Sequence, residues 1–228
     1  MRLSAYRDLL VRKNTFDFGL LEPGDIVLCA NPRDVFLLRT LLFWSHAGIY
    51  TGDEGAHAFV DAVNLPVRGR RRGGRLTWQR VRYSSLAMYQ SYVDVVVLRV
   101  DCPPEKRLAA ADFAQTQLGK PFPRNLWVSF LSRRSDAQAY SCTSLVWHAY
   151  KIQGLDLSPL WLFRLVLPWP SALAANPRVR IIGVGTRLKN VPWRSPYLML
   201  AFERFWFKAI LRKRIAPPAG PAEPPPRC

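Results

Sequence analysis

The segment 93–100 reads Val-Asp-Val-Val-Val-Leu-Arg-Val and constrains the fold more than any other part of the chain. So many β-branched and apolar residues predict a central strand of a sheet. Shorter strand patterns precede it at 26–30, 46–50 and 57–62. The last two patterns are joined by a turn at Gly52-Asp53, so they predict a β-hairpin.

The pattern becomes helical after this strand. Residues 105–118 predict a helix that ends at Gly119 and Pro121. A second helix is predicted from Cys142 to Gln153, with Ser141 as its N-cap and Gly154 as its stop. Because strands come first and helices later, with hairpin-type strand connections, the sequence predicts an α+β fold with an antiparallel sheet packed against helices.

The chain has 228 residues, which fits one medium domain with appendages. We expect an N-terminal helix and linker over 1–21 and a main domain over 22–186. A basic amphipathic helix is predicted over 187–216. Residues 217–228 contain six prolines and predict a disordered tail.

The net charge of +17 comes mainly from two segments. Residues 68–82 carry seven arginines and no acidic residue, and residues 187–214 carry eight basic residues and one acid, so each contributes +7. This excess indicates an anionic partner. The first segment is predicted to be a loop, in which Arg70, Arg71 and Arg72 are either solvated or in contact with phosphates.

The second basic segment also has an apolar, aromatic face, which is typical of a helix lying in a membrane interface. The alternative is a terminal helix packed on the core. Its candidate contacts with an anionic surface are Lys208, Arg212, Lys213 and Arg214. Since the sequence shows no secretory signal and no apolar stretch of 18 residues, we expect a cytoplasmic protein bound peripherally to the inner face of the membrane.

Cys142 is predicted to lie in the first turn of a helix. The free N–H groups and partial positive charge of a helix N-terminus stabilise a thiolate, and they can also hold the oxyanion formed when sulfur attacks a carbonyl. A buried structural cysteine is the alternative. The four cysteines contain no C-x-x-C pair and there are only three histidines, so no metal site is expected.

Three histidines could serve as the base for this thiol. His148 lies six residues further along the same helix and faces away from Cys142, so a packing or surface role is expected. His46 begins a strand and is followed by the small residues Ala47 and Gly48. Asp61 on the next strand could orient its imidazole, with His57 as a substitute.

Five motifs in this order carry a family resemblance: Pro-Gly-Asp-Ile-Val-Leu (23–28), Trp-Ser-His-Ala-Gly-Ile-Tyr-Thr-Gly-Asp (44–53), Phe-Val-Asp-Ala-Val (59–63), Gln-Leu-Gly-Lys-Pro-Phe (117–122) and Ser-Cys-Thr-Ser-Leu-Val-Trp-His-Ala-Tyr (141–150). Over residues 22–180 the chain resembles the circularly permuted NlpC-type papain-like cysteine hydrolases of the YiiX/YebB-like group. Lecithin:retinol acyltransferase-type enzymes are relatives of that group. The histidine strand precedes the cysteine helix here, as in the permuted proteins.

The resemblance implies a permuted papain-like fold in which Cys142 is the nucleophile, His46 the base and Asp61 the third member. In the acyltransferase branch a second histidine takes that third role, which keeps His57 open. Supporting roles fall to His57, Tyr140, Ser141 and Thr143. The implied reaction is acyl transfer from an amide or ester through a Cys142 thioester, with no metal or organic cofactor.

We expect a lipid or lipid-linked substrate at a membrane surface, because the basic helix favours such a location. A cell-wall peptide amidase or endopeptidase is the alternative. A third reading is a non-enzymatic binder of nucleic acid or another anionic surface, built on the arginine-rich loop. The aromatic residues flank that loop rather than alternate with its arginines, which argues against nucleic acid. The sequence gives no indication of oligomeric state.

Overall fold

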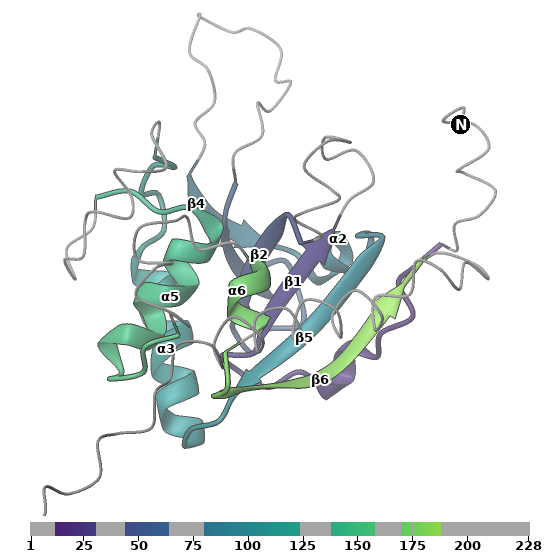
Figure 1. Cartoon of the computed structure of the whole chain (residues 1–228). Coiled ribbons are helices and arrows are strands. Elements are labelled where there is room, and N and C mark those ends of the chain that lie inside the picture. The colour runs from purple at the N-terminus through teal and green to yellow at the C-terminus, as the bar shows by residue number, and fades with distance from the viewer. Residues whose placement is uncertain are drawn as a thin grey trace, which may run out of the picture.

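Six strands form one antiparallel sheet in the computed structural model, which describes residues 12–30, 44–63, 80–123, 138–157, 170–174 and 176–187 (Figure 1). Their order across the sheet is β4-β3-β2-β1-β5-β6. The predicted α+β class, with an antiparallel sheet and helices beside it, is confirmed. The strands are β1 (Ile26–Ala30), β2 (His46–Tyr50), β3 (Phe59–Ala62), β4 (Val81–Ser84), β5 (Asp94–Val100) and β6 (Val179–Thr186).

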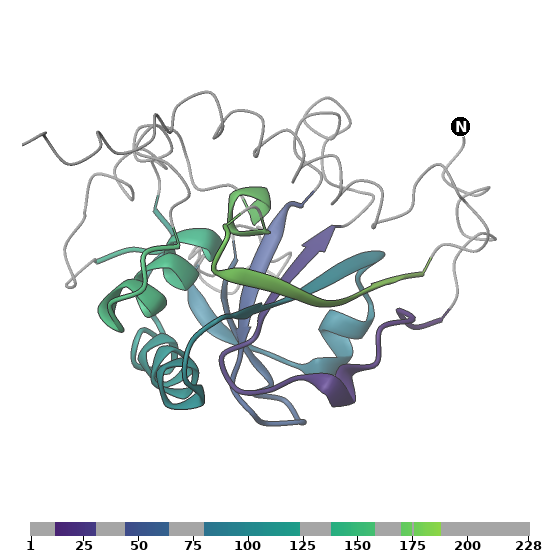
Figure 2. The same ribbon diagram turned by 60° about the horizontal axis from the view of Figure 1, so that its bottom comes forward.

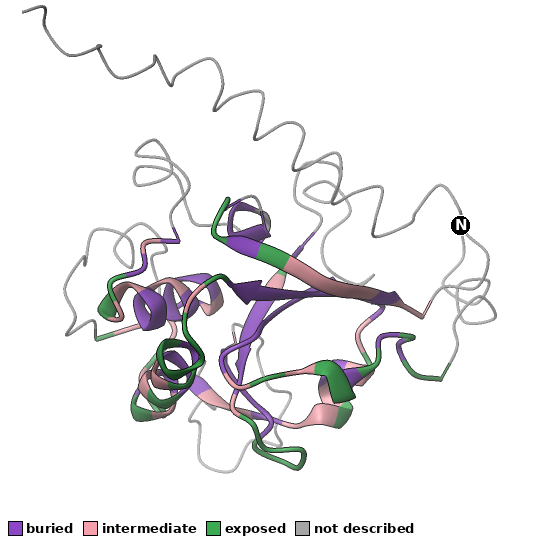
Figure 3. Ribbon diagram, turned by 90° about the horizontal axis from the view of Figure 1, so that it is seen from below, coloured by how far each residue is buried: buried purple, intermediate pink, exposed green. Residues whose placement is uncertain are grey.

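The helices lie on both faces of this sheet (Figure 2). The longer helices α3 (Pro104–Thr116) and α5 (Cys142–Ile152) pack on one face, together with the short α6 (Pro170–Ala174). The opposite face is covered by α2 (Leu86–Gln90) and the 3-10 helix η1 (Phe18–Leu20). Each face therefore has its own apolar core, and the strands between them are largely buried (Figure 3).

The strand predicted at 93–100 is confirmed as β5, which lies between β1 and β6. All seven of its residues are buried. Val96 and Leu98 face the core under α3 and α5, whereas Val95 and Val97 face the core under α2. The apolar run at 95–98 is thus explained, because a strand covered on both faces has no side that faces water.

Helix α5 begins as the sequence predicts. Ser141 is its N-cap: its side chain accepts a hydrogen bond from the Ser144 N–H, and the Ser144 hydroxyl accepts one from the Ser141 N–H. This reciprocal capping box fixes where the first helical turn starts. Cys142 is therefore held at the first helical position.

The second strand of the predicted hairpin starts later than expected. β3 begins at Phe59, and His57 lies in the exposed turn that follows β2. The expected strand over 57–62 is therefore wrong at its start, and His57 is not part of it. In the turn, the Thr51 hydroxyl donates hydrogen bonds to the carbonyl groups of His57 and Ala58, which separates His57 from the regular pairing.

Two edge strands and helix α2 have no counterpart in the sequence prediction. β4 begins at Val81, inside the segment 68–82 that predicts a loop. β6 contains Gly183 and Gly185, which weaken a strand signal. A Cβ at Gly183 would lie 2.7 Å from the Phe16 ring, and one at Gly185 would lie 1.9 Å from the side-chain oxygen of Asn14. These glycines are needed because residues 14–16 cross the strand closely.

Residues 14–21, part of the expected linker, instead run along the sheet. The Asn14 side chain donates to the Val93 carbonyl at 3.2 Å, and the Thr15 hydroxyl accepts from the Thr186 N–H at 3.0 Å. Phe16 and Phe18 are buried in the core under α2. This stretch therefore belongs to the main packing unit.

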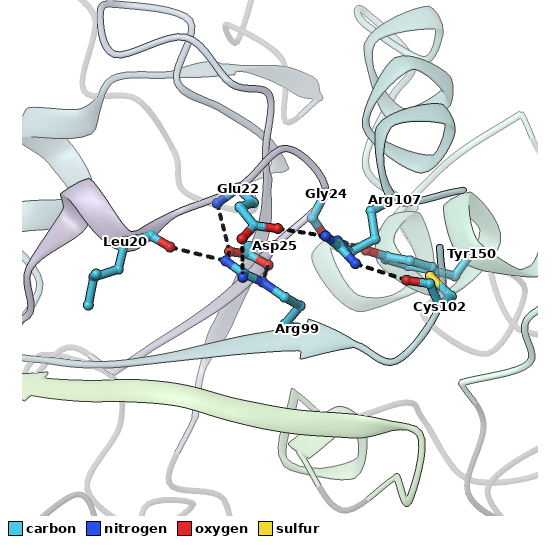
Figure 4. A network of polar contacts seen from close by, with 8 residues as sticks. All are labelled: Leu20, Glu22, Gly24, Asp25, Arg99, Cys102, Arg107 and Tyr150. Carbon is cyan, nitrogen blue, oxygen red and sulfur yellow. Dashed lines mark hydrogen bonds and ion pairs between the residues drawn. The ribbon is translucent and has the colours of Figure 1, made fainter. Parts of the chain in front are cut away.

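An ionic network, buried at Asp25, Arg99 and Arg107, joins this N-terminal stretch to β5 and α3 (Figure 4). Arg99 donates two hydrogen bonds to Asp25, at 2.8 and 2.7 Å, and also bonds to Glu22. Arg107 bonds to the other oxygen of Glu22 at 2.6 Å and to the Cys102 carbonyl at 2.9 Å. The network is at the end of β1 that is remote from Cys29 and His46.

Several predictions lie outside the described residues. They are the N-terminal helix expected before residue 12, residues 68–79 of the arginine-rich loop with Arg70, Arg71 and Arg72, and the basic helix and tail beyond residue 187 with Lys208, Arg212, Lys213 and Arg214. Among the residues that are described, no helix has the length and apolar character needed to cross a membrane.

Candidate active site

Cys142 is partly exposed at the N-terminus of α5. Its sulfur is 4.0 Å from the Thr143 hydroxyl, and the His46 side chain and the Ala47 N–H lie close enough to lower the pKa of the thiol. The thiol thus faces the start of β2, a strand almost one hundred residues earlier in the chain. α5 packs against β2 and β3, and this packing brings Cys142 next to the start of β2.

His46 lies at the first position of β2, and its side chain is only 13% exposed. Its Nε2 is 3.0 Å from Oδ2 of Asp61. Since Nε2 is engaged there, Nδ1 is the nitrogen available to the Cys142 thiol. The Tyr92 ring stacks on the imidazole with centroids 6.0 Å apart. The imidazole is therefore oriented from Nε2 and from one face of the ring.

Asp61 is fully buried in β3, the strand next to the edge strand β4. Its Oδ2 accepts a second hydrogen bond, from the Tyr89 hydroxyl at 3.1 Å. Its Oδ1 lies 3.7 Å from Nε of Arg82 on β4. A buried carboxylate is stable only with such partners, so the site is built around the Asp61 charge.

The pKa values of Cys142 and His46 shift in opposite directions. Burial raises the pKa of Cys142, but the hydrogen bond and charge of His46, with the Ala47 N–H and Thr143 hydroxyl, bring it below its ordinary 9.0. Burial lowers the pKa of His46, but Asp61 and Cys142 raise it from 6.5 to about 10. Both shifts favour a thiolate–imidazolium pair at neutral pH.

The first turn of α5 adds an anion-binding element beside this pair. In an α-helix the first backbone N–H groups have no partner within the helix. Here the Ser144 N–H donates to the Ser141 cap, and Cys142 and Thr143 are the two helical residues before Ser144. The N–H groups of Cys142 and Thr143 can donate to an oxygen that becomes negative next to the sulfur. The arrangement therefore combines a nucleophile, a proton carrier and oxyanion donors.

The structure brings together Cys142, His46 and Asp61, and it leaves His57 apart from them. The His57 side chain is 62% exposed, lies 4.0 Å from Asp53 and packs on the Tyr83 ring. His57 is thus not in a position to replace Asp61.

The remaining candidates lie around the helix start. Ser141 and Thr143 flank Cys142, as expected. Tyr140 is buried, and its ring packs edge-on against His148. His148 is itself buried, and burial, with the charges of Lys151 and Lys120, lowers its pKa to about 4. It is a packing histidine, as the helical spacing indicates.

Sequence reasoning missed Tyr89 and Arg82, and it considered Gly48 only as a small residue next to His46. A Cβ at Gly48 would lie 1.9 Å from the Tyr89 hydroxyl oxygen, so the glycine leaves the space that this hydroxyl occupies. A glycine inside a strand is a signal of close approach by another group, and it could have indicated such a neighbour. Tyr89 and Arg82 carried no signal, because their elements were not predicted.

A second thiol lies close to the site. Cys29 is fully buried in β1, where it is paired with His46. Burial raises its pKa, and so do the negative charges of Asp61 and Cys142, so Cys29 remains a neutral thiol. Within the described ranges, no group of three or more His, Cys, Asp or Glu side chains has an arrangement that could hold a metal ion.

The fold and the site together define an α+β protein with a Cys–His–Asp constellation between a helix N-terminus and two strands. No family model matches the chain, and no curated protein matches it. Among solved structures, the chain is similar to the crystal structure of the metalloprotein YiiX from Escherichia coli O157:H7. The TM-score is 0.47 and the sequence identity 18%, over 71% of this chain and 96% of that chain.

Proposed function

We propose that this protein is a cysteine hydrolase or acyltransferase that cleaves an amide or ester bond through a thioester on Cys142. One observation carries the proposal: the Cys142 thiol, at a helix N-terminus, has its pKa lowered by His46, whose Nε2 is bonded to buried Asp61. A thiol, an imidazole and an orienting group in this relation are the minimum for nucleophilic catalysis by cysteine.

The reaction proceeds in two halves. The Cys142 thiolate attacks the substrate carbonyl, and the N–H groups at the start of α5 stabilise the oxyanion of the tetrahedral intermediate. His46 then gives its proton to the leaving amine or alcohol, and the C–N or C–O bond breaks to leave a thioester. Water or another acceptor next loses a proton to His46 and attacks the thioester, which releases the acyl group and the thiolate.

The order of the site along the chain supports a permuted papain-like fold. The strand with His46 and the strand with Asp61 precede the helix with Cys142. This is the order of the permuted NlpC-type group, whereas in ordinary NlpC enzymes the cysteine comes first.

We propose a lipid or lipid-linked acyl donor at an anionic membrane surface, with the protein held peripherally on the cytoplasmic side. The support for this part is the basic and apolar sequence of residues 187–216. A pool of diacyl lipids and lipopeptides on anionic vesicles is therefore the first substrate set to test, with cell-wall peptides as the alternative set.

Detection of the acyl-enzyme tests the chemistry directly. The full chain is mixed with an activated short-chain ester, quenched in acid, digested with trypsin and analysed by mass spectrometry. The expected result is an acyl group on peptide 135–151, which contains Cys142 as its only cysteine. Cys142→Ala abolishes the adduct and ester turnover. Cys102→Ala, the same change at another partly exposed thiol, leaves both intact. Equal turnover by Cys142→Ala would refute the proposal.

A further inference from the structure

Two cationic groups, from His46 and Arg82, face the buried carboxylate of Asp61. His46 is bonded to Oδ2 at 3.0 Å, and Nε of Arg82 lies 3.7 Å from Oδ1. The second distance is too long for a hydrogen bond. Among the described residues, Oδ1 of Asp61 and Nε of Arg82 are both buried atoms that have no hydrogen-bond partner. A small rotation of the carboxylate toward Arg82 would satisfy both atoms and weaken the contact with His46.

The Tyr89 hydroxyl opposes this rotation. It donates to Oδ2 at 3.1 Å, the same oxygen that His46 uses. Its position is itself fixed: the Tyr89 ring stacks on Phe59 with centroids 3.7 Å apart, and the missing Cβ at Gly48 leaves room for the hydroxyl. Burial raises the pKa of Tyr89 well above 10, and so does the Asp61 charge. The hydroxyl therefore keeps its proton and acts as a donor.

We propose that Tyr89 is a positioning residue that holds Asp61 on His46 in competition with Arg82. The inference rests on the proposed function, because it concerns how the His46 proton is kept available to Cys142. It assigns Tyr89 a role through Asp61 rather than in contact with the substrate. It also explains why residue 48 is glycine, since any side chain there would displace the Tyr89 hydroxyl.

Loss of the hydroxyl should change the protonation of Cys142. Without the bond from Tyr89, Asp61 turns toward Arg82 and the His46 imidazolium loses its partner. The thiolate is then less stabilised, and the pKa of Cys142 rises. The other titratable groups near these side chains are Cys29 on β1 and Tyr92, which packs on His46. Neither is altered by the substitution.

The test is the pH dependence of Cys142 alkylation by iodoacetamide, read on peptide 135–151 of the full chain. Tyr89→Phe is expected to raise the midpoint by about one pH unit, which is about a tenfold loss of thiolate. Tyr50→Phe is the matched control. It removes a hydroxyl from the same apolar cluster, where its ring also packs on Phe59, and it should leave the midpoint unchanged. An unchanged midpoint in Tyr89→Phe would show that Tyr89 only fills space.

Arg82 variants test the competition itself. In Tyr89→Phe/Arg82→Gln the competing cation is gone, so the midpoint should return toward that of the wild type. A double variant that stays as high as Tyr89→Phe would overturn the role of Arg82. The single variant Arg82→Gln keeps the inference testable if Tyr89→Phe does not fold. The Arg82 side chain is 39% exposed, so its replacement should be tolerated. It should not raise the midpoint, and a raised midpoint would mean that Arg82 supports the site.

Alkylation needs no substrate, so the inference and the proposed function can fail separately. If the midpoints shift as expected while no ester or amide is cleaved, the positioning role stands and the enzymatic proposal fails. If esters are cleaved through Cys142 but Tyr89→Phe leaves the midpoint unchanged, the enzymatic proposal stands and the positioning role fails.

Discussion

Asp61 determines where the proton lies in the candidate site. It is fully buried, and its carboxylate faces His46, Tyr89 and Arg82 from three different elements. Its hydrogen bond and charge offset the effect of burial on His46 and keep the imidazole protonated at neutral pH. The thiolate of Cys142 depends on that imidazolium, so a residue that never touches the sulfur sets its reactivity.

The pH profile of activity should therefore be bell-shaped, with limbs that Asp61 controls. Activity rises as Cys142 loses its proton, because its pKa is below 9.0. Activity falls as His46 loses its proton, because its pKa is about 10. Asp61→Asn removes the charge that raises the pKa of His46, so the alkaline limb moves to lower pH. The maximum of kcat/KM should fall about 100-fold. The profile is measured with an activated ester from pH 5 to about pH 11, a range that spans both limbs.

Asp53→Asn is the control for this substitution. Asp53 lies 4.0 Å from His57 in an exposed Asp–His pair, and its loss should leave the profile unchanged. An alkaline limb that stays near pH 10 in Asp61→Asn would contradict the role assigned to Asp61.

At the scale of elements, the first turn of α5 places the nucleophile. The capping box of Ser141 and Ser144 holds this turn, and the turn supplies both the partial positive charge and the N–H groups next to Cys142. The other half of the site comes from the adjacent strands β2 and β3, whose register pairs Gly48 with Asp61. Secondary structure thus fixes all three side chains, and no loop is needed to position them.

Loss of the cap should affect both stability and the thiol. Ser141→Ala removes the acceptor of the Ser144 N–H, so the free energy of unfolding should fall by about 1 kcal/mol. The alkylation midpoint of Cys142 should rise, because a frayed first turn stabilises a thiolate less well. Urea unfolding and alkylation of peptide 135–151 measure the two effects.

Asp17→Ala provides the comparison for this variant. It removes the side-chain bond to the Gly19 N–H at the start of η1, on the other face of the sheet, so it should leave the thiol unchanged. If Ser141→Ala lowers stability without moving the alkylation midpoint, the cap has a structural role only.

At the scale of the whole molecule, the ionic network around Arg99 ties three separate segments together. Asp25 precedes β1, Arg99 lies in β5 and Arg107 in α3, and Glu22 bridges the two arginines. The hydrogen bonds of Arg99 to Asp25 and Glu22 raise the pKa of its guanidinium, with Asp25 the main cause. The network lies away from Cys142, so it serves the packing of the sheet and not the chemistry.

Arg99→Ala should destabilise the protein strongly. Asp25 is fully buried and would lose the two Arg99 donors, keeping only the Glu22 N–H on Oδ2, a change that costs about 3–5 kcal/mol for a buried ion pair. Arg180→Ala is the matched control, since Arg180 pairs with Arg99 across the sheet but is exposed. Urea unfolding should separate the two variants clearly. Equal stabilities would show that the network contributes nothing.

The sequence by itself determined the elements with a strong local signal. The mainly apolar strand β5, the strands β1 and β2 and the helices α3 and α5 follow from periodicity, and the Ser141 cap and Gly119 stop follow from turn chemistry. Cys142, His46 and Asp61 were also selected from the sequence, as a thiol at a helix start and an Asp–His pair on adjacent strands. The association of those residue types with particular local structures is what made this possible.

Only the tertiary structure decided what surrounds them. β4, β6 and α2 are short, or contain glycine and arginine, and they form because neighbouring strands and cores stabilise them. His57 was separated from Asp61 by the exact start of β3, and Tyr89 and Arg82 reached Asp61 from elements without a local signal. Contacts of this kind depend on how segments that are distant in the sequence pack together. The residues that make them therefore need not belong to any recognisable sequence pattern.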